Sequence, residues 1–168
     1  MTLGFSTTTQ DAEGAIVTQA DAGAVTEGAM RERFLEFTGP MEQKAPLYSA
    51  AKKDGRKGYE AARRGQGDTF APPVKKVDIK ELTLEAFLNP DAYFACRVSR
   101  GTYIRSLASD IGDRIGVPTT LMSLRRTACG GFNLGGALTL DALKRLSRAE
   151  IARHLEAGLE RAAAKIRT

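Results

Sequence analysis

The sequence predicts an α+β fold in which helices flank a mixed sheet. Strand-like and helix-like patterns are interspersed along the chain without the strict alternation of α/β proteins. Two adjacent patterns carry most of this prediction, an alternating strand over 93–99 and an amphipathic helix over 104–116. The chain has 168 residues, of which 42% are hydrophobic and 27% charged, and this composition is typical of a globular domain.

The strand and the helix form the clearest unit of the sequence. Phe94, Cys96 and Val98 fall on one side of the strand, and Gly101 separates the strand from the helix. The helix repeats apolar residues at helical spacing and ends near Gly116. These residues are Ile104, Leu107, Ala108, Ile111 and Ile115.

Weaker patterns precede this unit. Thr26 predicts the N-cap of a helix with Met30 and Phe34 on its apolar face, and Gly39 and Pro40 end that helix. The other expected elements are a turn-rich segment over 6–14, a strand over 15–18, a helical turn over 59–64 and two strands over 74–79 and 82–87.

Helices are also expected at the end of the chain. Thr139 predicts the cap of a short helix over 140–146, and Ser147 with Glu150 forms a capping box for a last helix. The apolar side of that last helix contains Ile151, Leu155, Leu159, Ala162 and Ile166. We therefore divide the chain into a main part, 1–146, and a C-terminal amphipathic helix, 147–168.

Composition excludes several classes of protein. No apolar run approaches the ~20 residues that cross a bilayer, and no signal-peptide pattern opens the chain. Cys96 and Cys129 are too few for a disulfide scaffold and lack metal-ligand spacing, so we expect a reducing, cytoplasmic setting and no metal. The single histidine, His154, makes a hydrolytic triad hard to assemble and is expected at the surface.

Charge is distributed unevenly, although the net charge is only +5. Residues 1–30 carry four acidic side chains and no Lys or Arg, whereas residues 44–76 carry nine basic and three acidic ones. Such a density attracts polyanions, since each cation placed on a phosphate releases condensed counterions. A solvated basic face that keeps the protein soluble is the alternative.

Two constellations point to anion recognition. Arg105 falls in the first turn of the helix over 104–116, beside free backbone N–H groups, and Tyr103 lies next to it, so this helix start predicts an anion site or a structural arginine. The second constellation, 48–65, interleaves basic residues with tyrosines and glycines. Such a segment follows a phosphate backbone while its rings stack on bases, or else it is a solvated loop.

Taken together, four blocks in order resemble the TruB family, the bacterial tRNA pseudouridine synthases that isomerise the T-loop uridine. Residues 7–14 (TTTQDAEG) resemble the family's T-x-T-x-D-x-x-G block. Residues 37–65 contain Phe37, Gly39, Gln43 and the run PLYSAAK, with Ala45 in place of a proline. Residues 99–112 (SRGTYIRSLASDIG) and 124–126 (LRR) complete the match.

The resemblance implies a partial pseudouridine synthase catalytic domain and a role for each matching residue. Arg105 would pair with the catalytic aspartate, Tyr103 would lie against the target base, and Leu124 would close the pocket around it. The residues implied to contact the RNA are Tyr48, Lys52, Arg56, Lys57, Arg63, Arg125 and Arg126. The family reaction needs no cofactor and no metal. The implied partner of this chain is the T-arm of tRNA, and we expect the protein to be a monomer.

One departure from the family bears on mechanism. The family's catalytic aspartate lies in a G-x-L-D-P-x-A-T-G-like block, which does not occur in these 168 residues, and neither does the base-stacking tyrosine. Asp11 and Asp110 match other family positions, so neither is assigned as the nucleophile, and Arg105 is left without its expected partner. We therefore expect the chain alone to be inactive. It is either part of a synthase or a non-catalytic tRNA-binding module, and a chain that folds poorly is a third possibility.

Overall fold

The structure, a computed structural model, describes residues 1–53, 55–67 and 69–166. The chain forms two compact units, unit 1 over Met1–Ser123 and unit 2 over Leu124–Thr168. The predicted C-terminal segment, 147–168, contains the helix Arg148–Ile166, whereas packing divides the chain after Ser123. Residues 54, 68, 167 and 168 lie outside the described part.

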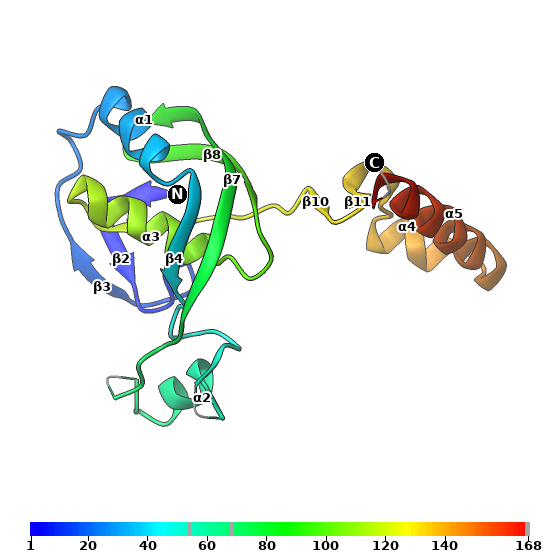
Figure 1. Cartoon of the computed structure of the whole chain (residues 1–168), viewed down its shortest axis with the longest axis horizontal. Helices are drawn as coiled ribbons and strands as arrows, with labels where there is room; N and C mark the ends of the chain where they lie inside the picture. Colours follow the sequence, from blue (N-terminus) through cyan, green and yellow to red (C-terminus); the bar gives the residue numbers. More distant parts are fainter. Residues whose placement is uncertain (54, 68, 167–168) are drawn as a thin grey trace. The chain divides into compact units, whose positions relative to one another are not determined.

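Unit 1 is built on a five-stranded sheet with the order β4–β7–β8–β1–β9 (Figure 1). The strands are β1 (Thr2–Leu3), β4 (Gly39–Lys44), β7 (Val74–Leu88), β8 (Asp91–Val98) and β9 (Thr119–Thr120). Each neighbouring pair in this sheet is antiparallel, and a parallel contact occurs at the isolated bridge between Asp11 and Leu121. The predicted α+β class is confirmed, with an antiparallel main sheet.

Two short hairpins accompany the main sheet in unit 1. β2 (Phe5–Thr7) pairs with β3 (Ile16–Gln19), and β5 (Lys52–Lys53) pairs with β6 (Arg56–Lys57). The helices of unit 1 are α1 (Glu27–Glu36), α2 (Gly58–Arg63) and α3 (Ile104–Ile115). The residues between β4 and β7, 45–73, contain β5, β6 and α2, and we call this segment the α2 lobe.

The core of unit 1 lies where α1 and α3 pack against each other and against the sheet. The predicted apolar face of α3 is confirmed, because Leu107, Ala108 and Ile111 are fully buried. Phe34 of α1 meets Phe94 of β8 edge to face at 5.7 Å between ring centroids. This packing holds the first turn of α3 at the edge of the sheet that β4 forms.

Two expectations for the sheet were wrong. The strands predicted over 74–79 and 82–87 are one 15-residue strand, β7, whose register shifts between Ile79 and Glu81 and between Leu84 and Ala86. These irregularities interrupt the alternation that sequence reasoning uses to recognise a strand. Strand β4 was not expected, because Pro40 suggests the end of an element; proline is tolerated there since β4 is an edge strand.

Unit 2 contains short elements followed by two helices. They are β10 (Ala128–Cys129), β11 (Phe132–Asn133), a 3-10 turn (Leu134–Gly136), α4 (Leu140–Arg145) and α5 (Arg148–Ile166). The predicted caps are confirmed: Thr139 accepts the N–H of Ala142, and Ser147 exchanges hydrogen bonds with Glu150. His154 is half-buried, with Nε2 3.1 Å from the Gly136 carbonyl oxygen, so it is not a simple surface residue.

The predicted apolar side of α5 is exposed only in part, since Ile151 is half-buried. Leu155 and Leu159 are both mostly exposed, whereas the side chains of Ala162 and Ile166 lie outside the described part. Among the described residues, no helix has both the length and the hydropathy that a membrane span requires.

Candidate functional site

The start of α3 is fixed by a buried glutamine of the edge strand β4. Tyr103 is the N-cap residue, and its side chain forms no capping hydrogen bond. Gln43 supplies the missing contacts: its Oε1 accepts the Tyr103 N–H at 2.8 Å, and its Nε2 donates to the Tyr103 carbonyl at 3.1 Å. Gln43 is only 2% exposed, so these bonds are shielded from water. The position of Arg105, two residues further on in the first turn of α3, follows from this anchor.

Arg105 joins three segments that are distant in sequence. Its Nη1 donates to the Thr9 carbonyl at 2.8 Å and to Asp11 Oδ2 at 2.9 Å, and its Nη2 donates to the Tyr48 carbonyl at 2.9 Å. The Arg105 and Asp11 side chains are 24% and 27% exposed, so solvent screens this ion pair only in part. The predicted anion site at this helix start therefore contains a carboxylate of the same chain.

Asp11 is a carboxylate partner of Arg105 that the sequence did not indicate, and it is distinct from the absent catalytic aspartate. Burial alone would raise the pKa of Asp11, but hydrogen bonds from the Thr9 hydroxyl and the Glu13 N–H and the charge of Arg105 outweigh it, so the pKa is lowered. Asp11 is thus an ionised carboxylate held by several donors, and the resemblance assigns it no nucleophilic role.

Gln10 holds the turn that presents Thr9 and Asp11, and sequence reasoning gave it no role. Its φ of 63° is in the left-handed region, which non-glycine residues seldom occupy. Its carbonyl accepts the Leu121 N–H at 3.1 Å, and its Oε1 lies 3.3 Å from the Ser106 hydroxyl of α3. No local pattern indicates such a conformation, since all of these partners are distant in sequence.

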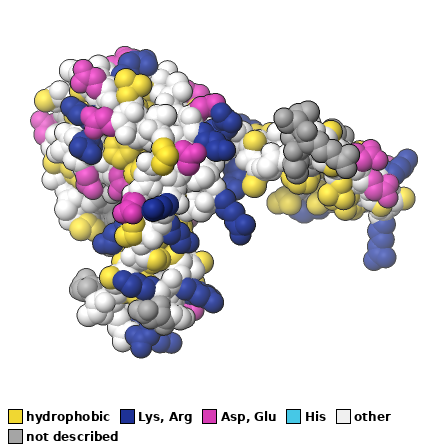
Figure 2. All heavy atoms as spheres, in the orientation of Figure 1, with side chains coloured by type: hydrophobic (Ala, Val, Ile, Leu, Met, Phe, Trp, Pro, Cys, Tyr) yellow, Lys and Arg dark blue, Asp and Glu magenta, His cyan; other side chains and the backbone are white. Residues whose placement is uncertain are grey.

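A dense group of cations lies in the α2 lobe. In the β5–β6 hairpin, Lys52 stands opposite Lys57 and Lys53 opposite Arg56. Like charges directly opposite each other destabilise a strand pair. Figure 2 shows Lys and Arg side chains over this lobe, which Figure 1 marks with the label α2. An arrangement that costs stability in the free protein favours an anionic partner.

Within the α2 lobe, residues 47–51 connect the Arg105 contacts to helix α2. The Tyr48 carbonyl accepts Arg105, the next carbonyl, of Ser49, accepts the Tyr59 N–H at 3.3 Å, and the Ala51 carbonyl accepts the Gly58 N–H at 3.2 Å. A Cβ on Gly58 would lie 2.2 Å from the Leu47 carbonyl oxygen, so the approach of the two segments requires glycine. The predicted RNA-contacting residues Tyr48, Lys52, Arg56, Lys57 and Arg63 all lie within this connected part.

Leu124, Arg125 and Arg126 belong to unit 2, which is described by itself. Leu124 is 61% exposed, and Arg126 Nη1 lies 3.7 Å from Cys129 Sγ. Their roles beside the base and the RNA remain predictions. Within residues 1–53, 55–67 and 69–166, no group of three or more His, Cys, Asp or Glu residues is suited to hold a metal ion.

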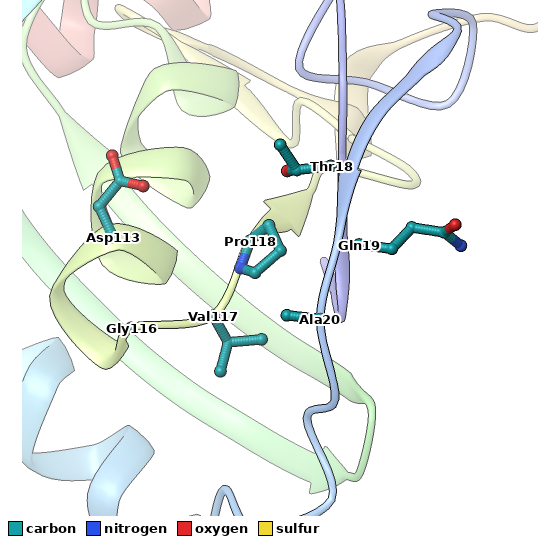
Figure 3. Close-up of a pocket in the computed structure, with 7 residues that line it drawn as sticks. All are labelled: Thr18, Gln19, Ala20, Asp113, Gly116, Val117 and Pro118. Carbon is teal, nitrogen blue, oxygen red and sulfur yellow. The ribbon is translucent and has the colours of Figure 1, made fainter.

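A pocket of about 370 Å³ lies elsewhere in unit 1 (Figure 3). It is lined by residues 18–20 and 116–118 and by Asp113, and in Figure 3 Ala20 points toward Pro118. Asp113 is eight residues beyond Arg105 on α3, a separation of about 12 Å along the helix axis. The pocket is therefore distinct from the Arg105 contacts.

Comparisons with known proteins agree on one family. The model of the "TruB family pseudouridylate synthase (N terminal domain)" matches residues 1–104. A tRNA pseudouridine synthase B of Burkholderia mallei is 43% identical over 143 residues, covering 85% of this chain and 46% of the relative. The protein of the same name from Cupriavidus metallidurans is 45% identical over 143 residues, covering 84% and 45%. The chain thus spans about half the length of the curated relatives it matches.

A solved structure supports the fold. A chain in the crystal structure of a Cbf5-Nop10-Gar1 complex matches with a TM-score of 0.56 and 28% identity, covering 71% of this chain and 31% of that chain. The predicted fold class is therefore confirmed by an independent likeness. Because the family model matches more than half of the residues and the relatives exceed 40% identity over most of the chain, the chain belongs to the TruB family of pseudouridine synthases.

Proposed function

We propose that the protein acts as a tRNA pseudouridine synthase on the T-loop uridine, with this chain supplying the arginine side of the active site and part of the tRNA-binding surface. The observation that carries the proposal is the set of contacts of Arg105. A charged side chain held by Thr9, Asp11 and Tyr48 is preorganised, so it stabilises negative charge without reorganising during the reaction.

Arg105 retains donors for a second carboxylate. A guanidinium carries five N–H groups, and its hydrogen bonds with the described residues use three of them. The Nε–H and one Nη2–H remain to receive the family's catalytic aspartate. The positive charge then keeps that aspartate ionised, as a nucleophile requires.

The remaining steps of the proposed reaction take place on the target uridine, beside Arg105. The target uridine is flipped out of its loop at a cost of a few kcal/mol. The aspartate carboxylate attacks C1′ of the uridine and displaces N1 of the base, which breaks the glycosidic bond. The base turns, its C5 bonds to C1′ and displaces the aspartate, and the C5 proton is released while N1 gains one. We assign Tyr103 and Leu124 to the surfaces that hold the base while it turns, and the reaction needs neither a metal nor an organic cofactor.

The α2 lobe suits the T-arm. Its facing cation pairs, Lys52 with Lys57 and Lys53 with Arg56, become favourable when phosphates lie between and around them. Arg63 on α2 and Arg125 and Arg126 in unit 2 extend the proposed RNA contacts. We further propose that the protein is cytoplasmic and monomeric. Sedimentation of the free protein tests the monomeric state.

Tritium release from a uridine-labelled T-arm hairpin tests the enzymatic proposal. We expect no release from the 168-residue chain alone. A fusion that places an aspartate-bearing segment with the family's G-x-L-D-P-x-A-T-G-like block before residue 1 should release tritium, and Arg105→Lys should reduce that rate by about 100-fold. Full activity of the fused Arg105→Lys variant would contradict the assigned role of Arg105.

A non-catalytic tRNA-binding module is the second candidate, and the cation pairs of the β5–β6 hairpin favour it independently of any chemistry. In filter binding, the chain alone should retain the hairpin, and the triple substitution Lys52→Gln, Arg56→Gln and Lys57→Gln should weaken binding and flatten its salt dependence. Binding without turnover in the fusion supports this candidate over the enzyme.

A further inference from the structure

Tyr59 lies at the centre of the cationic part of the α2 lobe. The Lys57 Nζ is 5.4 Å from the centroid of the Tyr59 ring and 3.1 Å from its hydroxyl oxygen. The Arg63 Cζ is 5.5 Å from the same centroid. Both distances are within the range of cation–π attraction. One half-buried aromatic ring therefore contacts two of the residues predicted to bind RNA.

The ring restrains two side chains that would otherwise be mobile. A free Lys or Arg side chain loses up to about 2 kcal/mol of rotamer entropy when a ligand immobilises it. Contact with Tyr59 removes part of that cost before the ligand arrives, which is preorganisation. The hydrogen bond to the Tyr59 hydroxyl, together with the Glu60 carboxylate, raises the pKa of Lys57, so these contacts favour the charged form of the lysine.

Tyr59 is itself fixed by the backbone. Its N–H donates to the Ser49 carbonyl, and the preceding Gly58 N–H donates to the Ala51 carbonyl. Ser49 follows Tyr48, whose carbonyl accepts Arg105. The position of the ring is thus tied to the same segment that contacts the candidate active-site arginine.

We propose that Tyr59 is a positioning residue that gathers Lys57 and Arg63 into a two-cation clamp for the RNA phosphate backbone. The inference rests on the proposed RNA-binding function and deepens it. It also revises the expectation that tyrosines of this basic segment stack on bases, because cations already occupy the surroundings of this ring. Glu60 lies 3.6 Å from Lys57 Nζ in a solvent-exposed pair, which a phosphate replaces at little cost.

Salt dependence distinguishes a clamp from a stacking platform. We would measure binding of the full chain to a fluorescent T-arm hairpin by anisotropy between 50 and 200 mM salt, the range over which counterion release has a large effect. Lys57→Gln should reduce the slope of log K against log salt by roughly one, and Tyr59→Leu by one to two. Tyr59→Phe, which keeps the ring for Arg63, should fall between the native chain and Tyr59→Leu.

A double-substitution cycle tests whether Tyr59 acts through Lys57. In the Lys57→Gln background, Tyr59→Phe should have little further effect, because the hydroxyl has lost the side chain that it holds. Arg64→Gln is the matched control: it removes one charge beside Arg63, and its effect should add fully to that of Tyr59→Phe. Unchanged thermal melts of Tyr59→Phe keep these comparisons valid if Tyr59→Leu fails to fold.

Each other outcome overturns the clamp in a recognisable way. If Tyr59→Leu weakens binding at constant slope while Tyr59→Phe keeps native binding, Tyr59 stacks on a base and the clamp is overturned. If the effects of Tyr59→Phe and Lys57→Gln on RNA binding are fully additive, Tyr59 does not position Lys57. Native RNA affinity and slope in both Tyr59 variants overturn the clamp alone, whereas no binding by the native chain overturns it together with the proposed RNA-binding function.

Discussion

Arg105 Nη1 lies 2.9 Å from Asp11 Oδ2, although 94 residues separate them in sequence. The contact closes a loop that contains most of unit 1 and brings the T-x-T-x-D block against the first turn of α3. The Tyr48 carbonyl, on the other side of the guanidinium, joins the α2 lobe to the same point. A single side chain thus organises the segments that carry three of the family blocks.

Asp11→Asn should lower the free energy of unfolding at pH 7 by about 1 to 2 kcal/mol, since it removes a charge-assisted hydrogen bond. The pKa of Asp11 is lowered in the folded state. This stabilisation is therefore present above the unfolded pKa and is lost as the pH falls through the folded pKa. Urea unfolding at pH 7 and pH 3 checks both points, with Glu13→Gln as the control. Equal losses at both pH values would contradict the ion pair.

Gln43→Leu should destabilise unit 1 by about 2 to 3 kcal/mol, because it leaves the Tyr103 N–H without its buried partner. Gln43→Glu keeps an acceptor for the Tyr103 N–H but removes the Nε2 donor, so it tests the acceptor separately from the donor. Hydrogen exchange at the Tyr103 amide should accelerate in the leucine variant. Native exchange there would mean that α3 starts without help from β4.

Gln10 tests the left-handed conformation at the site. Gln10→Gly relieves a strained φ of 63° but loses the contact with Ser106, so we expect a net change within about 0.5 kcal/mol. Gln10→Val places a β-branched side chain in the same conformation and should cost about 2 kcal/mol. Thermal unfolding of both variants decides the matter, and equal stabilities would show that the turn adopts another conformation.

Asp110 should make the protein less stable as the pH rises from about 4 to about 6. Burial, with a smaller effect of Asp113, raises the pKa of Asp110 to about 6. Between the unfolded and folded pKa values the folded state holds the extra proton, so the free energy of unfolding decreases with increasing pH. Asp110→Asn should remove this dependence and stabilise the protein at pH 7 by roughly 1 kcal/mol after screening by solvent. Asp113→Asn should reduce this pH dependence only in part, because Asp113 is the smaller cause of the raised pKa of Asp110.

Gly58→Ala should disrupt the α2 lobe without unfolding the main sheet. The added Cβ would lie 2.2 Å from the Leu47 carbonyl oxygen, so the two segments must separate. We expect weaker T-arm binding and an unchanged main melting transition. Gly65→Ala is a partial control, because its Cβ would meet open space although its φ of 68° still favours glycine. Native affinity of Gly58→Ala would contradict the connection between 47–51 and α2.

The sequence by itself determined the local elements and the family. The strand of residues 93–98, the helix of residues 104–115 and the caps at Thr26, Thr139 and Ser147 follow from periodicity and from side chains that satisfy nearby backbone groups. These signals depend only on residues close in sequence, so they can be recognised without knowing the tertiary structure. The same holds for the family, which the comparisons confirm.

Only the tertiary structure decided which groups meet. It joined two expected strands into β7, formed β4 around Pro40 at the sheet edge, gave Arg105 a carboxylate in Asp11, and placed Lys57 and Arg63 on Tyr59. Contacts such as Arg105 with Asp11 depend on packing between segments tens of residues apart, so no local sequence pattern predicts them. Composition therefore predicts that a basic segment and an arginine recognise anions, whereas the fold selects the partner that each cation has within the protein.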